Sequence, residues 1–239
     1  MPQLGSSRAL NSLRRLCSGA AFLATIAFPA LACAQSGRLE HLGHAICGAT
    51  FVGDRHVVTA AHCLFDRQTG TRLPISDLSV VLRSESARID LNVESVQITS
   101  DFMMRARLSR DAISRDRAIL RLARAPEMRA ALIRPTEILR RPLFLRIGGP
   151  GGQACPVDAD YGDILALDCV LDPGTSGEGV FLIEDNTARL VAVISATIAG
   201  GRKTAAAPLR PILGHDDRRL WTSAGLRLTS RAYASGLSF

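Results

Sequence analysis

The sequence of 239 residues lacks the compositional bias of fibrous or disordered proteins, and it contains no internal repeat. Hydrophobic residues make up 47% of the chain and charged residues 21%, with 20 glycines and 11 prolines. This composition excludes a fibrous, low-complexity or disordered chain. It leaves one or two compact domains with a real hydrophobic core.

Lysine is almost absent, since Lys203 stands alone beside 28 arginines. We attribute this skew to GC-rich coding rather than to a chemical role. The formal net charge of +7 could indicate a nucleic acid or a membrane surface as partner. Whether it does depends on where along the chain the positive charge is concentrated. Between Arg105 and Arg146, twelve arginines meet four acidic residues, a net charge of +8 (12 − 4). This concentration predicts a solvated, Arg-rich connector and no nucleic-acid partner; contact with an anionic envelope polymer is the alternative.

Long apolar runs are missing beyond residue 34. The run Leu16–Ala34 has nineteen uncharged residues and follows three arginines. Pro29 and then an A-x-A pattern ending at Ala34 are typical of a secretory signal that is cleaved after Ala34. A retained membrane anchor and lipidation at Cys33 are the alternatives. We therefore expect residues 1–34 to be a signal peptide and the mature protein to be secreted or periplasmic, with no membrane span.

The mature chain has four cysteines but no C-x-x-C pair. An even number of cysteines in an exported chain indicates disulfides, and the missing C-x-x-C pair disfavours a four-cysteine metal site. We expect disulfides, no metal and no organic cofactor. The four residues are Cys47, Cys63, Cys155 and Cys169.

Short β-branched and apolar runs, separated by Gly, Asp, Asn and Pro, make up most of the mature chain. Many short runs at modest spacing predict an all-β barrel or sandwich. The segment Ala123–Arg141 lacks alternation and is expected to be a connector, with room for a helical turn, between two β-units of similar size. The tail Pro211–Phe239 fits either a short helix or a loose end. The expected strands are Ala45–Val52, His56–Thr59, Leu78–Leu82, Ile89–Ile98, Ala118–Leu122, Leu143–Ile147, Ile164–Leu167, Gly179–Ile183 and Leu190–Ser195.

The first motif with chemical meaning joins apolar strands to a histidine. The chain reads C-G-A-T-F-V from Cys47 and then T-A-A-H-C ending at Cys63. A lone histidine is more often structural than catalytic. Because His62 comes at the end of its strand with a cysteine beside it, we interpret it as a candidate general base.

The second motif is a glycine-rich loop around a serine. Residues Asp172–Phe181 read D-P-G-T-S-G-E-G-V-F, with Ser176 between two glycines. A serine hydroxyl is a poor nucleophile until a base takes its proton, and the oxyanion that forms needs preorganised donors. Gly174 would let its own N–H and that of Ser176 point into one oxyanion hole. The alternative interpretation is a plain polar loop.

The third motif supplies an acid. The string S-R-D-R-A-I-L-R-L places Asp116 directly before an apolar strand. A carboxylate there would accept a hydrogen bond from the imidazole, fix its tautomer and stabilise the imidazolium. Asp101 and Asp111 are the other candidates for this role, but only Asp116 is followed by the apolar alternation of a strand.

These three motifs, in the chain order His62, Asp116, Ser176, resemble those of the trypsin/chymotrypsin-like serine proteases. The resemblance extends over about Ala45–Pro208, and the nucleophile loop looks closer to bacterial, glutamyl endopeptidase-like members. It implies two six-stranded antiparallel β-barrels with the active site between them. Residues 35–125 would form the first barrel, 126–142 a connector, and 143–239 the second barrel with a C-terminal tail.

The resemblance also implies residue roles. Cys47 and Cys63 would clamp the histidine loop, while Cys155 and Cys169 would bracket the segment before the nucleophile loop. The partner would be a polypeptide substrate, cleaved by the three catalytic residues through an acyl-enzyme. Its backbone would pair with the edge of the strand that ends near Ser195. The substrate-binding residues implied are Val170, Ser195, Ala196 and Thr197.

Several positions depart from the family pattern. Thr175 replaces the acid that receives a new N-terminal ammonium in digestive proteases, so we expect no pro-peptide switch. Glu178 stands where the family has a small residue, and it could shape leaving-group specificity or face solvent. Arg202 and Lys203 could attract an acidic side chain of the substrate, or form a solvated loop. A catalytically weak fold that binds envelope proteins or polyanions is the alternative function, and an esterase with the same triad is a third.

Overall fold

The computed structural model describes residues 36–83, 87–98, 102, 104, 109–133, 144–185 and 187–209. The expected signal peptide 1–34 and the tail from Pro211 lie outside the described residues. So do residues 105–108 and 134–143, which hold part of the Arg-rich segment and of the connector. Among the described residues, none of the helical segments has the length and apolar content needed to cross a bilayer.

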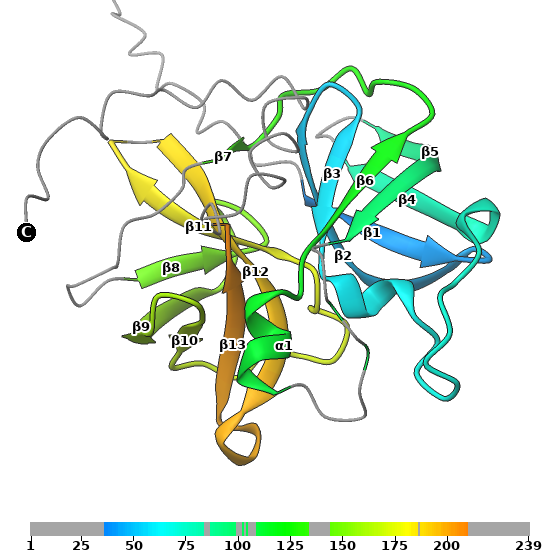
Figure 1. Cartoon of the computed structure of the whole chain (residues 1–239). Helices are drawn as coiled ribbons and strands as arrows, with labels where there is room; N and C mark the ends of the chain where they lie inside the picture. Colours follow the sequence, from blue (N-terminus) through cyan, green and yellow to red (C-terminus); the bar gives the residue numbers. More distant parts are fainter. Residues whose placement is uncertain are drawn as a thin grey trace, which may run out of the picture.

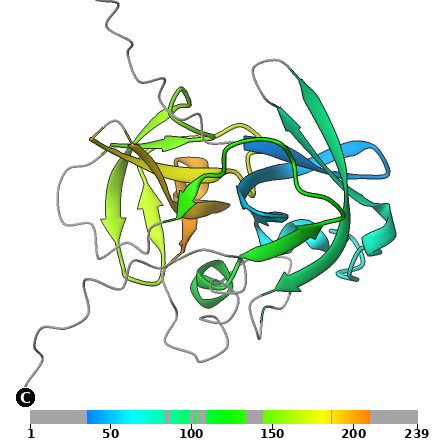
Figure 2. The ribbon, with the colours of Figure 1, turned by 90° about the horizontal axis from the view of Figure 1, so that it is seen from above.

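Two closed, six-stranded antiparallel barrels lie side by side (Figures 1 and 2). The first closes in the order β1-β2-β3-β6-β5-β4, and the second in the order β11-β8-β9-β10-β13-β12 through the β11–β12 pairing. The expectation of an all-β protein with two such barrels is confirmed. The short strand β7 (Leu132–Ile133) adds to β12 in parallel. The barrel strands are β1 (Ser36–His41), β2 (His44–Gly53), β3 (His56–Thr59), β4 (Leu78–Arg83), β5 (Arg88–Ile98), β6 (Ala118–Leu122), β8 (Phe144–Ile147), β9 (Ala154–Asp160), β10 (Leu165–Leu167), β11 (Gly179–Glu184), β12 (Thr187–Ile198) and β13 (Lys203–Pro208).

Among the residues that the structure describes, helical structure is confined to short pieces between strands. The α-helix α1 (Arg110–Ser114) is capped by Ser109, whose side chain accepts the N–H of Ala112. The 3-10 turns are η1 (Ala61–Leu64), η2 (Ile75–Asp77) and η3 (Ala199–Gly201). The expected connector contains β7, and its described part, residues 123–133, has no helical turn.

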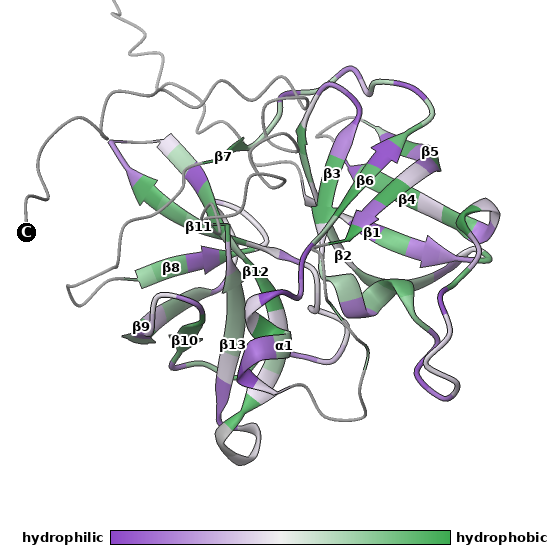
Figure 3. Cartoon of the chain, in the orientation of Figure 1, coloured by the Kyte–Doolittle hydropathy of each residue, from purple (hydrophilic) through white to green (hydrophobic). Residues whose placement is uncertain are grey.

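The barrel interiors are packed with aliphatic side chains. Strands such as β5 alternate buried and exposed positions, because one face meets the core and the other meets water. Figure 3 shows hydrophobic and hydrophilic positions mixed along the strands of the first barrel. The first core extends across the boundary between the barrels, since Phe181, Leu190 and Leu209 belong to the same buried cluster as Leu39 and Leu120. This shared core fixes how the two barrels meet.

Candidate active site

His62 lies in the 3-10 turn η1, directly after β3, rather than in the strand itself. All four residues of this turn are buried. A disulfide joins Cys63 to Cys47 on β2, with Cα atoms 6.1 Å apart. The second disulfide joins Cys155 to Cys169, so the two pairs are those that the resemblance implies. The first disulfide therefore holds the histidine turn against the neighbouring strand.

Asp116 lies between α1 and β6 and is completely buried. Its Oδ1 accepts the backbone N–H of His62 at 2.8 Å, and its Oδ2 is 2.6 Å from Nδ1 of the imidazole. Ser195 on β12 donates its hydroxyl to the same Oδ2 at 2.5 Å. Burying a carboxylate is costly unless hydrogen bonds compensate, and three donors do so here. Because a carboxylate only accepts, we assign the proton of His62 to Nδ1, which leaves a lone pair on Nε2.

Ser195 has a contact that the sequence interpretation did not anticipate. We expected this residue to take part in substrate binding, yet its side chain is buried and faces Asp116. The two residues are 79 positions apart, so no local pattern signals the contact. Because β12 is a strand of the second barrel, this barrel also helps to hold Asp116.

The loop that carries Ser176 is tied to one strand of each barrel. The N–H of Gly48 on β2 donates to the carbonyl of Ser176 at 2.7 Å, and the N–H of Gly177 donates to Ile194 on β12 at 2.8 Å. Gly177 has a φ of +83°, and a Cβ there would lie 2.4 Å from the carbonyl of Gly48. Only glycine fits this position. These two hydrogen bonds hold the loop against β2 of the first barrel and β12 of the second.

The hydroxyl of Ser176 makes no hydrogen bond within the described residues, whereas His62, Asp116 and Ser195 form one connected network. Ser176 itself is half-buried. In enzymes without substrate, the hydrogen bond between nucleophile and base is often long and tightens on binding. The structure therefore joins His62 and Asp116 directly. It brings the serine loop to the end of β3, where a Cβ on Gly177 would lie 2.4 Å from Oγ1 of Thr59 and 3.2 Å from the backbone nitrogen of Ala60.

The backbone N–H groups on either side of Thr175 have no acceptor within the described part of the chain. They belong to Gly174 and Ser176, the pair expected to form the oxyanion hole. By contrast, the N–H groups of Thr175 and Glu178 are used inside the loop, donating to Asp172 and Thr175. Gly174 has a φ of +97°, in the region that favours glycine.

The expected substrate-binding positions differ in exposure. Val170 is 59% exposed, Ala196 is half-buried and Thr197 is exposed. One edge of β12 pairs with β13 at Ala196 and Thr197. The pairing of the other edge with β11 ends at Val193. Within the described residues, no strand pairs with the other edge of β12 beyond Val193. An extended peptide can add to a free strand edge of this kind.

Lys203, which could attract an acidic side chain of the substrate, is paired with an acidic residue of the protein itself. Its Nζ lies 2.6 Å from Oδ1 of Asp158, and this hydrogen bond raises the pKa of the lysine ammonium. An ammonium group that is paired with a carboxylate of the same protein offers little net charge to a ligand.

The comparison with protein families agrees with this geometry. Residues 24–137 match the family model described as Trypsin. The chain has a trypsin-like serine protease fold. The match supports the trypsin/chymotrypsin-like family, covers somewhat less than half of the chain and includes His62 and Asp116, whereas Ser176 lies outside it. No feature of the match distinguishes a glutamyl endopeptidase-like branch.

Glu178 is one of the positions at which the loop around Ser176 departs from the family pattern. Its half-buried side chain lies where the two barrels meet: a Cβ on Gly48 would be 2.2 Å from Cγ of Glu178, and one on Gly148 would be 3.1 Å from Oε2. The carboxylate has no hydrogen bond or ion pair with any described residue. Its burial raises the pKa of Glu178 above the ordinary value, with a weaker opposing effect from Arg38.

This burial predicts how Glu178 affects stability. Because its pKa is raised in the folded state, its carboxyl contributes most to stability when protonated, below the ordinary value of 4.5, and that contribution is lost as pH rises through the raised pKa. We expect Glu178→Gln to unfold at the same urea concentration as the parent near pH 4 and at a higher one at about pH 8. The control is Glu127→Gln, at an exposed position, which should unfold like the parent at both. A Glu178→Gln midpoint equal to or below that of the parent at about pH 8 would contradict the prediction.

Proposed function

We propose that this protein is an exported serine endopeptidase. In this mechanism the hydroxyl of Ser176 attacks the peptide carbonyl, and Nε2 of His62 takes its proton and later gives it to the leaving amine. Asp116 keeps the proton of the neutral imidazole on Nδ1 and stabilises the imidazolium. The N–H groups of Gly174 and Ser176 donate to the oxyanion. Water then hydrolyses the acyl-enzyme by the same route.

The observation that best supports this proposal is the pair of hydrogen bonds between Asp116 and His62. A buried carboxylate that holds both the backbone N–H and Nδ1 of one histidine fixes the ring in the orientation that a general base needs. The two disulfides favour an oxidising compartment, as expected for a secreted or periplasmic protein after removal of residues 1–34.

A fluorophosphonate probe together with a peptide library tests the proposal. We expect the folded protein to be labelled, Ser176→Ala not to be labelled, and peptides to be cleaved at internal bonds. Absence of labelling in folded protein would contradict an enzyme and favour a binding module. Labelling with hydrolysis of small esters only would favour an esterase. A preference for acidic residues before the scissile bond would support the glutamyl endopeptidase-like branch.

A further inference from the structure

The helix α1 lies directly before Asp116 in the chain and packs against β13 of the second barrel (Figure 1). Ile113 is the buried residue of this helix, with 4% of its surface exposed. It forms a small apolar cluster with Ile164, which precedes β10, and with Ala205 on β13. An apolar side chain therefore holds α1 against the second barrel, although the strands before and after the helix, β5 and β6, belong to the first.

A charged contact holds the other end of α1. Arg110, its first residue, donates from Nε and Nη2 to the two carboxylate oxygens of Asp163, at 3.1 and 2.7 Å. Its guanidinium carbon lies 5.2 Å from the centre of the Tyr161 ring, within the range of a cation–π contact. Both partners lie in the turn between β9 and β10. A bidentate pair of this kind fixes the orientation of both groups, so α1 is held at two points on the second barrel.

The backbone carries this placement from α1 to Asp116. The helix ends at Ser114 and β6 begins at Ala118, so residues 115–117 form the whole link between them. Within that link, the N–H of Asp116 donates to the carbonyl of Ile113 at 3.1 Å. The strand β6 then pairs with β3 and β5 of the first barrel. Asp116 therefore lies between a helix docked on the second barrel and a strand of the first.

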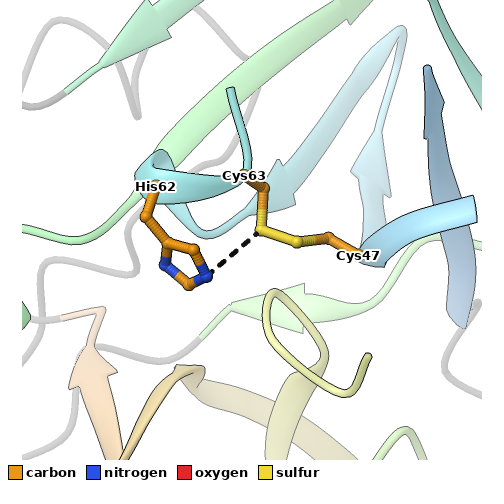
Figure 4. Close-up of side chains that lie close together, drawn as sticks. All are labelled: Cys47, His62 and Cys63. Atoms are coloured by element: carbon orange, nitrogen blue, oxygen red, sulfur yellow. Dashed lines mark hydrogen bonds between the residues drawn. A yellow bond between two sulfur atoms is a disulfide. The ribbon is translucent and has the colours of Figure 1, made fainter. Parts of the chain in front are cut away.

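His62, by contrast, is held by the first barrel. The disulfide between Cys47 on β2 and Cys63 fixes the turn that carries His62, and Sγ of Cys63 lies 3.7 Å from Nε2 of the imidazole (Figure 4). The 2.6 Å contact between Nδ1 of His62 and Oδ2 of Asp116 therefore joins a base placed by one barrel to an acid placed partly by the other. How well these two groups meet depends on the docking of α1.

We propose that Ile113 and Arg110 are positioning residues, which bring the carboxylate of Asp116 to hydrogen-bond distance from the imidazole by docking α1 on the second barrel. Both act through Asp116 rather than on the substrate. An acid that is misplaced by about 1 Å supports its imidazole poorly, and an error of that size can lower a rate by about 100-fold. The effect on hydrolysis rests on the proposed function, whereas the hydrogen bond between Asp116 and His62 can be measured without it.

The proton on Nδ1 of His62 reports this hydrogen bond in the folded protein without substrate. We expect a separate low-field proton resonance for it in the parent and in Ser176→Ala, which lacks the proposed nucleophile. Ile113→Ala should lose this resonance to exchange with water while its circular dichroism stays native, and Ile113→Val should keep it. Persistence of the parent resonance in Ile113→Ala would overturn the proposal.

Ile147→Ala is the matched control for a loss of stability. Ile147 on β8 is also 4% exposed, but it belongs to a different apolar cluster of the second barrel. The change removes the same atoms from an equally buried position, so it should lower the urea midpoint as Ile113→Ala does. The Nδ1 resonance should nevertheless match that of the parent. Loss of the resonance in both variants would indicate a general loosening of the structure and contradict a specific role of Ile113.

The charged contact gives a test that does not depend on the folding of Ile113→Ala. Arg110→Ala and Asp163→Ala should each weaken the Nδ1 resonance and lower kcat by about two- to fivefold, because an exposed ion pair contributes less than a buried side chain. Their double variant should lose no more than either alone, since both changes remove the same contact. Arg88→Ala is the control and should match the parent, because Arg88 forms a similar exposed pair with Asp90 within the first barrel. Parent values of both kcat and the resonance in Arg110→Ala would overturn the proposal.

Kinetics separate the role of α1 from the proposed function. At saturating peptide, Ile113→Ala should lower kcat by about 100-fold. The diagnostic quantity is kcat, because Ala196, an expected substrate-binding residue, packs against the cluster of Ile113 and its displacement would change KM. No peptide hydrolysis by the parent, with the resonance changing across the variants as expected, would contradict the proposed function and support the role of α1. An active parent with unchanged kcat in Ile113→Ala would overturn that role.

Discussion

Replacing Ser176 or His62 by alanine is expected to lower kcat for peptide hydrolysis by about 10⁶-fold, and replacing both should lower it little further. In the proposed mechanism the two residues act as one unit, since the hydroxyl is reactive only while the imidazole takes its proton. Once either is absent, the other has nothing left to contribute. The N–H groups of Gly174 and Ser176 remain in every variant, so a residual rate above that of water should persist.

Steady-state kinetics on a peptide found in the library screen would measure this effect. Ser114→Ala and His44→Ala are matched controls, because both replace the same residue types and neither side chain hydrogen-bonds to His62 or Asp116. Both controls should keep the parent rate. Losses that multiply in the double variant would show that Ser176 and His62 act independently, which would contradict the triad.

Asp116→Asn is expected to lower kcat by about 10⁴-fold near neutral pH, while the protein still folds. Oδ2 of Asp116 now receives the Nδ1 proton of His62 at 2.6 Å. In the asparagine variant an amide nitrogen stands at that position and donates a hydrogen bond. The imidazole must then accept this bond with a lone pair on Nδ1, so its own proton is carried by Nε2. A protonated Nε2 cannot take the proton of Ser176.

The matched control for this change is Asp111→Asn. Asp111 is a neighbouring acid in α1 that competed with Asp116 for the same role on sequence grounds. Its side chain is 71% exposed and pairs with Arg115, outside the imidazole network. We expect its kcat to equal that of the parent. A loss of less than tenfold in Asp116→Asn, with native circular dichroism, would contradict the assigned tautomer.

Local patterns predicted those strands that are short runs of apolar and β-branched residues. The strands β3 and β6 occur with the expected boundaries, His56–Thr59 and Ala118–Leu122, because their apolar residues reflect burial that local sequence already encodes. Among the barrel strands, β1, β9 and β13 were missed. Polar residues dominate β1, β9 contains Pro156, and β13 is rich in alanine, so their pairing comes from neighbouring strands rather than from propensity.

The candidate site shows the same division. The motifs around His62, Asp116 and Ser176 could be recognised because each is a short string of fixed spacing. Ser195 and Glu178 could not be interpreted in that way. The role of Ser195 depends on a partner 79 residues away, and the burial of Glu178 depends on the absence of side chains at Gly48 and Gly148.

The backbone bonds from Gly48 to Ser176 and from Gly177 to Ile194 connect the nucleophile loop to strands that belong to different halves of the molecule. A chain in which only one half has formed cannot hold the Ser176 loop in this position, even if that half is fully native. Under the proposed function, newly made or partly unfolded copies would then not hydrolyse neighbouring chains. In refolding, activity should return only with the docking of the two halves, so hydrolysis would report assembly rather than the formation of either barrel.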